Sequence, residues 1–313
     1  MRIVSLISSG TEILFALGLG RQVLGVSHEC DYPPDVRGLP RLTRSWIDSS
    51  RASGQIDDEV KVRLAAGGSL YEIDAETLCR LRPDLIVTQA QCDVCAVRYA
   101  DVVDLAQSRP ELAGAKIVAL NPHSLADVFG DIGRIAVATG AEAAAESVLA
   151  RLRHSVSAIE RATSELADSE RPRVVCLEWC EPLMAAGNWT PQLIELAGGR
   201  SCLAGAGAAS DYVAWEAVRA ADPDVLLIAP CGFDLARSRI EAAALARLPG
   251  LADLAAIRSG RAFILDGNAY LNRSGPRLVD TLELLAGLLH SRRVSPLTGE
   301  LAEGRAWARW SGY

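Results

Sequence analysis

Two stretches of the chain, LCRLRPDLIVTQAQC at residues 78–92 and VRAADPDVLLIAPCG at residues 218–232, share one layout. Each begins with the end of a helical pattern and passes through a Pro-Asp turn into an apolar run typical of a buried strand. Each then ends in a loop that carries a cysteine. Two distant segments with the same plan indicate two lobes of similar topology.

Strand and helix patterns alternate on both sides of these two stretches. The patterns predict strands at residues 2–7, 22–27, 85–88, 116–120, 173–177, 225–228 and 262–265. Such alternation is typical of parallel sheets, in which ligands bind beyond the carboxyl ends of the strands. We therefore expect an α/β protein with two Rossmann-like lobes, and functional residues in the loops that follow strands.

Helical patterns lie between these strands. They cover residues 9–17, 97–107, 124–140, 141–166, 191–197, 240–248 and 276–290, and the first has Ser9 and Glu12 at the spacing of a capping box. The pattern at 141–166 predicts a helix of about 40 Å, long enough to join two lobes as a rigid spacer. The expected parts are an N-terminal lobe, a linking helix, a C-terminal lobe and a polar C-terminal arm, at 1–123, 124–170, 171–290 and 291–313.

Composition excludes several classes of protein. Of the 313 residues, 50% are apolar and 23% are charged, and the net charge of −7 argues against nucleic acid as a partner. The apolar run at the N-terminus is broken at residues 8–12, which predicts neither a signal peptide nor a transmembrane anchor. We therefore expect a cytoplasmic protein, with a periplasmic location only if a leader has been removed.

Cysteine and histidine suggest a metal site. The loop after the second strand contains His28 and Cys30, and the loop after the third contains Cys92 and Cys95 in a Cys-x-x-Cys motif. A helix N-terminus at this motif would lower the thiol pKa values, and a thiolate–imidazole set favours zinc. The alternatives are reduced structural thiols or a thiol-redox pair.

Other loops after strands carry candidate ligand-binding residues. Trp179 and Trp189 would offer a flat apolar wall to a planar or macrocyclic ligand. The remaining candidates are polar or aromatic: Ser8, Ser9, Thr11, Tyr32, Gln91, Glu178, Phe233, Tyr270 and Asn272. Helix capping, core tryptophans and local turn hydrogen bonds are the structural alternatives. No motif pairs a nucleophile with a base, so an enzyme is not expected.

Several segments resemble the vitamin B12 (cobalamin)-binding proteins of ABC importers. They are RIVSLISSGTEILFALGLGRQVLGVSHECDYPP at 2–34, RPDLIVTQ at 82–89, GNWTPQLIELAGG at 187–199 and NRSGPRLVDTLELLAGLL at 272–289. The layout, with one long linking helix, is similar to the wider helical-backbone class that binds cobalamin, haem or iron–siderophores. The resemblance implies modest hinge motion, a ligand held between the lobes by loops of both, and an ABC permease as partner.

These observations lead to three hypotheses. The first is a non-catalytic binding protein for a corrinoid such as cobalamin, or a related metal complex, held in a cleft between the lobes. The second is a cytosolic metal-ion binding or sensing protein that uses the cleft cysteines for a zinc-like ion. The third is a thiol-redox enzyme that acts through Cys92 and Cys95.

Overall fold

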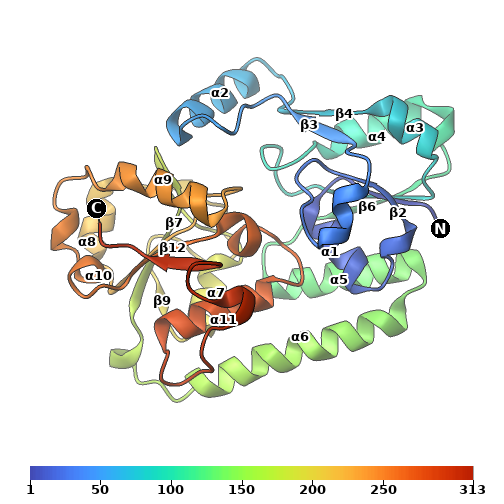
Figure 1. The fold of residues 1–313 in the computed structure, drawn as a ribbon. Coiled ribbons are helices and arrows are strands. Elements are labelled where there is room, and N and C mark those ends of the chain that lie inside the picture. Colours follow the sequence, from blue (N-terminus) through green and yellow to red (C-terminus); the bar gives the residue numbers. More distant parts are fainter. Residues whose placement is uncertain (313) are drawn as a thin grey trace. The chain divides into compact units, whose positions relative to one another are not determined.

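The computed structural model describes residues 1–312, which fold into two compact units (Figure 1). The N-terminal unit consists of Met1–Arg51, Gln55–Pro122 and Ala126–Arg151. The C-terminal unit consists of Ala52–Gly54, His123–Leu125 and the chain from Leu152 onward. Each unit has a sheet with parallel strands at its centre, so the predicted two-lobed α/β fold is confirmed.

The sheet of the N-terminal unit is fully parallel. Its strand order is β2 (Val23–Val26), β1 (Ile3–Ser5), β5 (Leu85–Gln89) and β6 (Lys116–Leu120). Every residue of β1 and β5 is buried, as expected for strands covered on both faces. The chain leaves β1 towards one edge of the sheet and leaves β5 towards the other. The loops after these two strands therefore flank a topological switch point.

Helix α1 (Ser8–Ala16) packs directly on this sheet. A Cβ atom at Gly10 would lie 2.6 Å from Val87 Cγ1, so only glycine permits the close approach. The predicted capping box at Ser9 is wrong, because the helix begins one residue earlier, after Ile7, a residue with no side-chain acceptor. The Thr11 hydroxyl bonds instead to the Ile7 carbonyl. The other helices here are α3 (Ala75–Leu81), α4 (Tyr99–Ser108) and α5 (Leu125–Thr139).

Residues 28–77, where the sequence patterns predicted neither a strand nor a helix, contain regular structure. Strand β3 (Thr43–Ser45) pairs antiparallel with β4 (Tyr71–Ile73), and helix α2 spans Ser53–Ala65. The helix was missed because it is mostly polar and has no wide apolar stripe. Ion pairs between residues four apart support it instead, from Lys61 to Asp57 at 2.6 Å and from Arg63 to Glu59 at 3.2 Å.

The predicted long helix is present as α6 (Glu142–Thr163), drawn in green in Figure 1. It continues without a break across the division between the units at Arg151 and Leu152. It ends at Thr163, whose hydroxyl donates to the Leu196 carbonyl at 3.0 Å. No helix within residues 1–312 is long and apolar enough to cross a bilayer.

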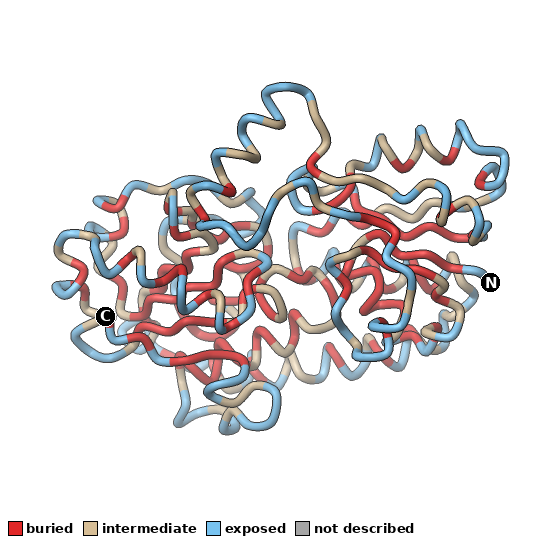
Figure 2. The backbone as a smooth tube through the Cα atoms, turned by 45° about the horizontal axis from the view of Figure 1, so that its top comes forward, coloured by how far each residue is buried: buried red, intermediate tan, exposed pale blue. Residues whose placement is uncertain are grey.

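The sheet of the C-terminal unit is mixed. Its centre is the parallel set β7 (Arg173–Cys180), β11 (Val225–Ile228) and β12 (Ala262–Leu265), and most of these residues are buried (Figure 2). Short strands extend this centre: β8 (Leu183–Ala185), β9 (Arg200–Ser201), β10 (Asp211–Tyr212) and β13 (Trp307–Arg309). The helices are α7 (Thr190–Leu196), α8 (Trp215–Ala221), α9 (Leu235–Leu245), α10 (Ala255–Arg258) and α11 (Leu278–Leu289).

The segment expected to be a polar C-terminal arm contributes to this sheet. Strand β13 lies antiparallel to β12, and Trp307 and Trp310 are both buried. The ring of Trp307 meets that of Phe263 edge-on, with 5.5 Å between their centroids. Burial of these two tryptophans therefore holds the segment against the sheet, although the rest of the segment is polar.

The two Pro-Asp turns make the same contacts in both units. Asp84 donates its N–H to the Arg2 carbonyl at 2.8 Å and accepts the Arg2 N–H on Oδ2 at 2.7 Å. Asp224 does the same with Arg173, at 2.9 Å and 2.8 Å. Each aspartate thus fastens the strand that it introduces to the start of the neighbouring strand, which supports the duplicated plan at the level of single residues.

Each turn also contains a residue in the left-handed conformation directly before the proline. These residues are Arg82, at φ 44°, and Asp222, at φ 35°. The left-handed conformation costs a residue with a Cβ atom roughly 1 kcal/mol, whereas glycine adopts it without this cost. We expect Arg82→Gly to raise the free energy of unfolding by about 0.5–1 kcal/mol in urea titrations.

Asp222→Gly is the matched comparison. Asp222 Oδ1 accepts the Ala255 N–H at 2.9 Å. Glycine at this position would remove the strain of the positive φ but would also remove this hydrogen bond, and the two effects oppose each other. We expect no net gain at this position. A loss of stability in Arg82→Gly, or an equal gain in both variants, would contradict the backbone explanation.

Asp224 makes stability sensitive to acid. The Arg173 guanidinium and the Arg173 N–H bond to its carboxylate and lower the pKa of Asp224 below its usual range. This contribution to stability is present above the unfolded-state pKa of about 3.9 and is lost as pH falls through the lower folded-state value. Because both side chains are 37% exposed, solvent screens this pair, and we expect Asp224→Asn to cost about 0.5–1 kcal/mol at pH 7, by urea titration, and progressively less below about pH 4.

Asp84→Asn provides the control for this prediction, because Asp84 accepts the equivalent backbone N–H of Arg2. At pH 7 it reports what the same substitution costs at a turn where the carboxylate accepts that backbone N–H. A constant difference between wild type and Asp224→Asn from neutral to acid pH would show that the carboxylate charge is unimportant.

Candidate functional site

The loop after β1 packs into the interior of the N-terminal unit. Ser8, Ser9 and Thr11 are all buried, and the Thr11 hydroxyl lies 3.1 Å from Cys30 Sγ. Cys30 is itself 1% exposed. The structure therefore places these four predicted site residues at the junction between α1 and the loop after β2.

His28 contacts the pair of strands β3 and β4. Its Nδ1 lies 2.7 Å from Thr43 Oγ1, its Nε2 lies 3.1 Å from Glu29 Oε1, and its ring centroid is 5.6 Å from that of Tyr71. The Tyr71 hydroxyl donates to the Val94 carbonyl at 2.7 Å. Tyr71 thus connects the loop after β2 with the Cys-x-x-Cys loop. We did not predict its role, because β4 has no clear alternating pattern.

Gln89, the last residue of β5, organises the Cys-x-x-Cys loop. Its Oε1 accepts the N–H groups of Gln91 at 2.7 Å and of Cys92 at 2.8 Å, and its Nε2 donates to the Cys92 carbonyl. Cys95 Sγ donates to Cys92 Sγ at 2.8 Å. The two sulfur atoms are therefore held together by a loop that is fixed at its base.

The low thiol pKa expected for this motif has a different cause from the predicted one. Helix α4 begins only at Tyr99, so Cys92 and Cys95 do not lie at its N-terminus. The hydrogen bond from the Cys95 thiol, with backbone N–H groups of Val94 and Cys95, lowers the pKa of Cys92 to about 6 against the opposing effect of burial. Local hydrogen bonds therefore favour the Cys92 thiolate.

The structure does not group Cys92 and Cys95 with the other predicted metal ligands, Cys30 or His28. Within residues 1–312, no three His, Cys, Asp or Glu side chains are arranged to hold a metal ion. Cys92 and Cys95 meet, whereas His28 is engaged with Thr43 and Cys30 is buried against Thr11. The donor set that would favour zinc therefore does not converge.

In the C-terminal unit, two aromatic side chains meet, one near the end of β7 and one in the loop that follows β11. Trp179 and Phe233 lie with ring centroids 5.3 Å apart and planes tilted by 34°. The Arg237 guanidinium carbon lies 4.6 Å from the Phe233 centroid, and Arg237 Nε donates to Glu241 at 2.9 Å. Strands β7 and β11 flank the topological switch point of this sheet. The pair formed by Trp179 and Phe233 therefore lies at the edge of the sheet where a ligand is expected to bind.

Trp179 also carries an unused donor. Its Nε1 is buried and has no hydrogen-bond partner among the residues that the structure describes. Buried indole N–H groups usually have an acceptor, since an unsatisfied donor costs about 1–3 kcal/mol. Trp179 is therefore a half-buried ring whose buried Nε1 lacks an acceptor within residues 1–312.

Three other candidates hold the loop after β12. Trp189 is buried and donates from Nε1 to the Leu271 carbonyl at 2.7 Å, as expected for the alternative of a core tryptophan. Tyr270 is also buried, donates to the Glu300 carbonyl at 3.1 Å and has its pKa raised to about 12 by burial. The Asn272 amide donates to the Gly267 carbonyl at 2.9 Å. All three side chains make contacts inside the unit. Such contacts are the structural alternative to ligand binding that the sequence analysis left open.

The last two candidates lie in different units. Glu178 is half-buried on β7, and its carbonyl accepts the Cys231 N–H at 2.9 Å. Tyr32 belongs to the N-terminal unit and is 45% exposed. Three pairs of predicted site residues are thus in contact: Trp179 with Phe233, Thr11 with Cys30, and Cys92 with Cys95.

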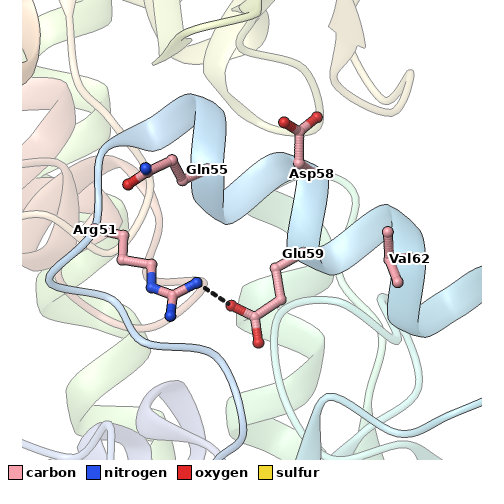
Figure 3. A pocket seen from close by; sticks show the side chains of 5 residues that line it. All are labelled: Arg51, Gln55, Asp58, Glu59 and Val62. Carbon is pink, nitrogen blue, oxygen red and sulfur yellow. Dashed lines mark hydrogen bonds and ion pairs between the residues drawn. The ribbon is translucent and has the colours of Figure 1, made fainter.

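A surface hollow of about 320 Å³ lies along α2 and contains none of the predicted residues. It is lined by Arg51, Gln55, Asp58, Glu59 and Val62 (Figure 3). Arg51 reaches Glu59 at 3.4 Å, whereas Asp58 points away from this pair. The charged lining differs from the apolar lining of typical small-molecule sites, so we do not place the ligand there.

Comparison with known proteins assigns the class. Residues 3–269 match the model of the periplasmic binding protein family, and the chain belongs to this family. A curated relative, the uncharacterized ABC transporter substrate-binding lipoprotein YvrC of Bacillus subtilis (strain 168), is 23% identical over 291 residues. The match covers 91% of this chain and 78% of the relative.

Two solved structures with the same fold are of proteins named for a metal-containing macrocycle. The periplasmic heme-binding protein RhuT from Roseiflexus sp. RS-1 is 27% identical, with a TM-score of 0.69 over 93% of this chain and 98% of that chain. The periplasmic vitamin B12 binding protein BtuF of Vibrio cholerae is 21% identical, with a TM-score of 0.61 over 92% and 96%. The resemblance to importer binding proteins is confirmed.

The prediction of a cytoplasmic protein is wrong. The family is one of periplasmic binding proteins, and the curated relative is a lipoprotein. The prediction depended on the broken apolar run at the N-terminus. That run forms β1 and α1, which are part of the folded unit and carry no information about export.

Proposed function

We propose that this chain is the extracytoplasmic ligand-binding component of an ABC importer and binds a planar metal-complex macrocycle, a corrinoid or a haem, without transforming it. Family membership supports the binding role and implies a permease as partner. The observation that carries the ligand class is the stacked layer of Trp179 and Phe233 at the carboxyl edge of the C-terminal sheet.

The chemistry of this layer matches that of such a ligand. Large aromatic side chains contribute most to binding through flat apolar contact, and a macrocycle offers a matching face. Corrinoids and haems also carry carbonyl or carboxylate acceptors at their rims. One of these acceptors would satisfy Trp179 Nε1, which has no protein partner within the described chain.

The choice between the two macrocycles depends on different observations. The segments at 2–34 and 187–199 resemble cobalamin-binding proteins, which favours a corrinoid. The higher identity to a haem-binding structure favours haem. The predicted zinc alternative is not carried forward, because Cys92 and Cys95 are not grouped with Cys30 or His28 within residues 1–312.

Ligand titration tests the proposal directly. Purified protein should be titrated separately with cyanocobalamin, haemin and the non-macrocyclic iron complex ferrichrome, with absorbance, tryptophan fluorescence and melting temperature as readouts. We expect one macrocycle to shift its absorption band, quench tryptophan fluorescence and raise the melting temperature in a dose-dependent way. No response to either macrocycle, or a response to ferrichrome alone, would contradict it.

A further inference from the structure

Cys92 and Cys95 differ from the buried cysteines of this chain. Within residues 1–312 none of the eight cysteines is part of a disulfide bond, and Cys30, Cys176 and Cys180 are buried. Cys95 is exposed and Cys92 is half-buried. Their sulfur atoms are 2.8 Å apart. Since a disulfide bond is about 2.05 Å long, bond formation requires the sulfur atoms to approach by less than about 1 Å.

The surrounding loop is held on both sides of the pair. The Gln89 amide fixes the backbone of Cys92 from one side. The Tyr71 hydroxyl fixes the Val94 carbonyl, between the two cysteines, from the other. Both anchors are hydrogen bonds to the backbone, so neither depends on whether the sulfur atoms carry protons or a bond. The loop is therefore prearranged for the thiol and the disulfide state alike.

We propose that Cys92 and Cys95 form a reversible dithiol–disulfide couple that undergoes exchange with an external disulfide. Cys92 Sγ, which accepts the hydrogen bond of the Cys95 thiol, attacks one sulfur of the external disulfide and releases the other as a thiolate. Cys95 then loses its proton and attacks Cys92 Sγ, which expels the second external thiolate. The protein loses two electrons and two protons, and the external disulfide becomes two thiols.

Buried cysteines of the C-terminal unit cannot take this role. An external disulfide cannot reach Cys176 or Cys180, and thiolates, not thiols, perform the attack. Burial raises the pKa of Cys180 to about 12 and also raises the pKa of Cys176. These two thiols are therefore internal controls for the exchange reaction.

The test uses the full chain without ligand, in buffers with defined ratios of reduced to oxidised glutathione. After quenching with N-ethylmaleimide, intact mass and peptide mapping report the state of each cysteine. We expect oxidising ratios to remove two hydrogens and to link Cys92 to Cys95, and reducing ratios to reverse this. Cys180→Ser should behave like wild type.

Single variants separate the two steps. Cys95→Ser should retain one glutathionyl group on Cys92, because the resolving thiol is missing, and Cys92→Ser should give no loop disulfide. Circular dichroism checks that both variants fold. If wild type accumulates mixed glutathione disulfides without the Cys92–Cys95 link, or links either cysteine elsewhere, the couple is excluded. Because no ligand is added, failure here is independent of the ligand-binding proposal.

Discussion

Trp189→Ala is expected to lower the free energy of unfolding by about 3–5 kcal/mol, the usual cost of deleting a large buried aromatic side chain. Trp189 is 7% exposed, and its Nε1 donates to the Leu271 carbonyl at 2.7 Å. The substitution leaves a cavity beside α7 and a buried carbonyl without its donor. Urea titration followed by circular dichroism measures the change.

Two variants serve as controls for this effect. Trp189→Phe retains most of the buried volume and loses only the indole donor, so a cost of about 1–2 kcal/mol is expected. Trp179→Ala removes a ring that is only half-buried and should cost less than Trp189→Ala. Similar costs for the two alanine variants would mean that both tryptophans belong equally to the core.

The sequence predicted the central strands closely because they are continuous apolar runs bounded by turn residues. The predicted strands at 225–228 and 262–265 coincide with β11 and β12. Helix α2 was missed for the opposite reason, since its sequence SGQIDDEVKVRLA has no apolar stripe and surface ion pairs support it. Periodicity identifies elements that bury a face, and it fails for elements that do not.

Contacts within one loop were predictable from the sequence, and contacts between distant segments were predictable only where the order of strands implied them. Cys92 and Cys95 meet because only two residues lie between them, and Trp179 meets Phe233 because Trp179 lies near the end of β7 and Phe233 follows the neighbouring strand β11. His28 and Cys30 are only two residues apart, but different partners hold them. A list of metal-binding residue types gives no information about such competing partners.

The two tryptophans illustrate the same limit. Trp179 lies near the end of β7 and Trp189 follows β8, and composition alone cannot distinguish a ring that faces a ligand from one that faces the core. In the structure, the two side chains differ in whether the indole Nε1 has an acceptor. Trp189 Nε1 has the Leu271 carbonyl as acceptor, whereas Trp179 Nε1 has no acceptor in the described part of the chain. Under the proposed function, this buried donor without an acceptor is what distinguishes Trp179 from Trp189 as the ring for the ligand.

Trp179→Ala is expected to weaken binding of whichever macrocycle the titration identifies by about 30–100-fold. This corresponds to about 2–3 kcal/mol, which is typical for loss of a central aromatic contact. The expectation rests on the proposed function, and dissociation constants from absorbance titration measure it. Because Trp179 is half-buried and has no internal hydrogen bond to lose within residues 1–312, the variant should remain folded, as its urea titration will show.

Trp179→Phe separates the two contributions of this side chain. Phenylalanine keeps a flat ring beside Phe233 and removes only the Nε1 donor, so a loss of about 5–10-fold is expected, in line with one hydrogen bond. If Trp179→Phe binds as weakly as Trp179→Ala, the hydrogen bond dominates and stacking is secondary. If both variants bind like wild type while remaining folded, the ligand does not contact this layer. The carboxyl edge of the C-terminal sheet would then hold the ligand through other residues or not at all.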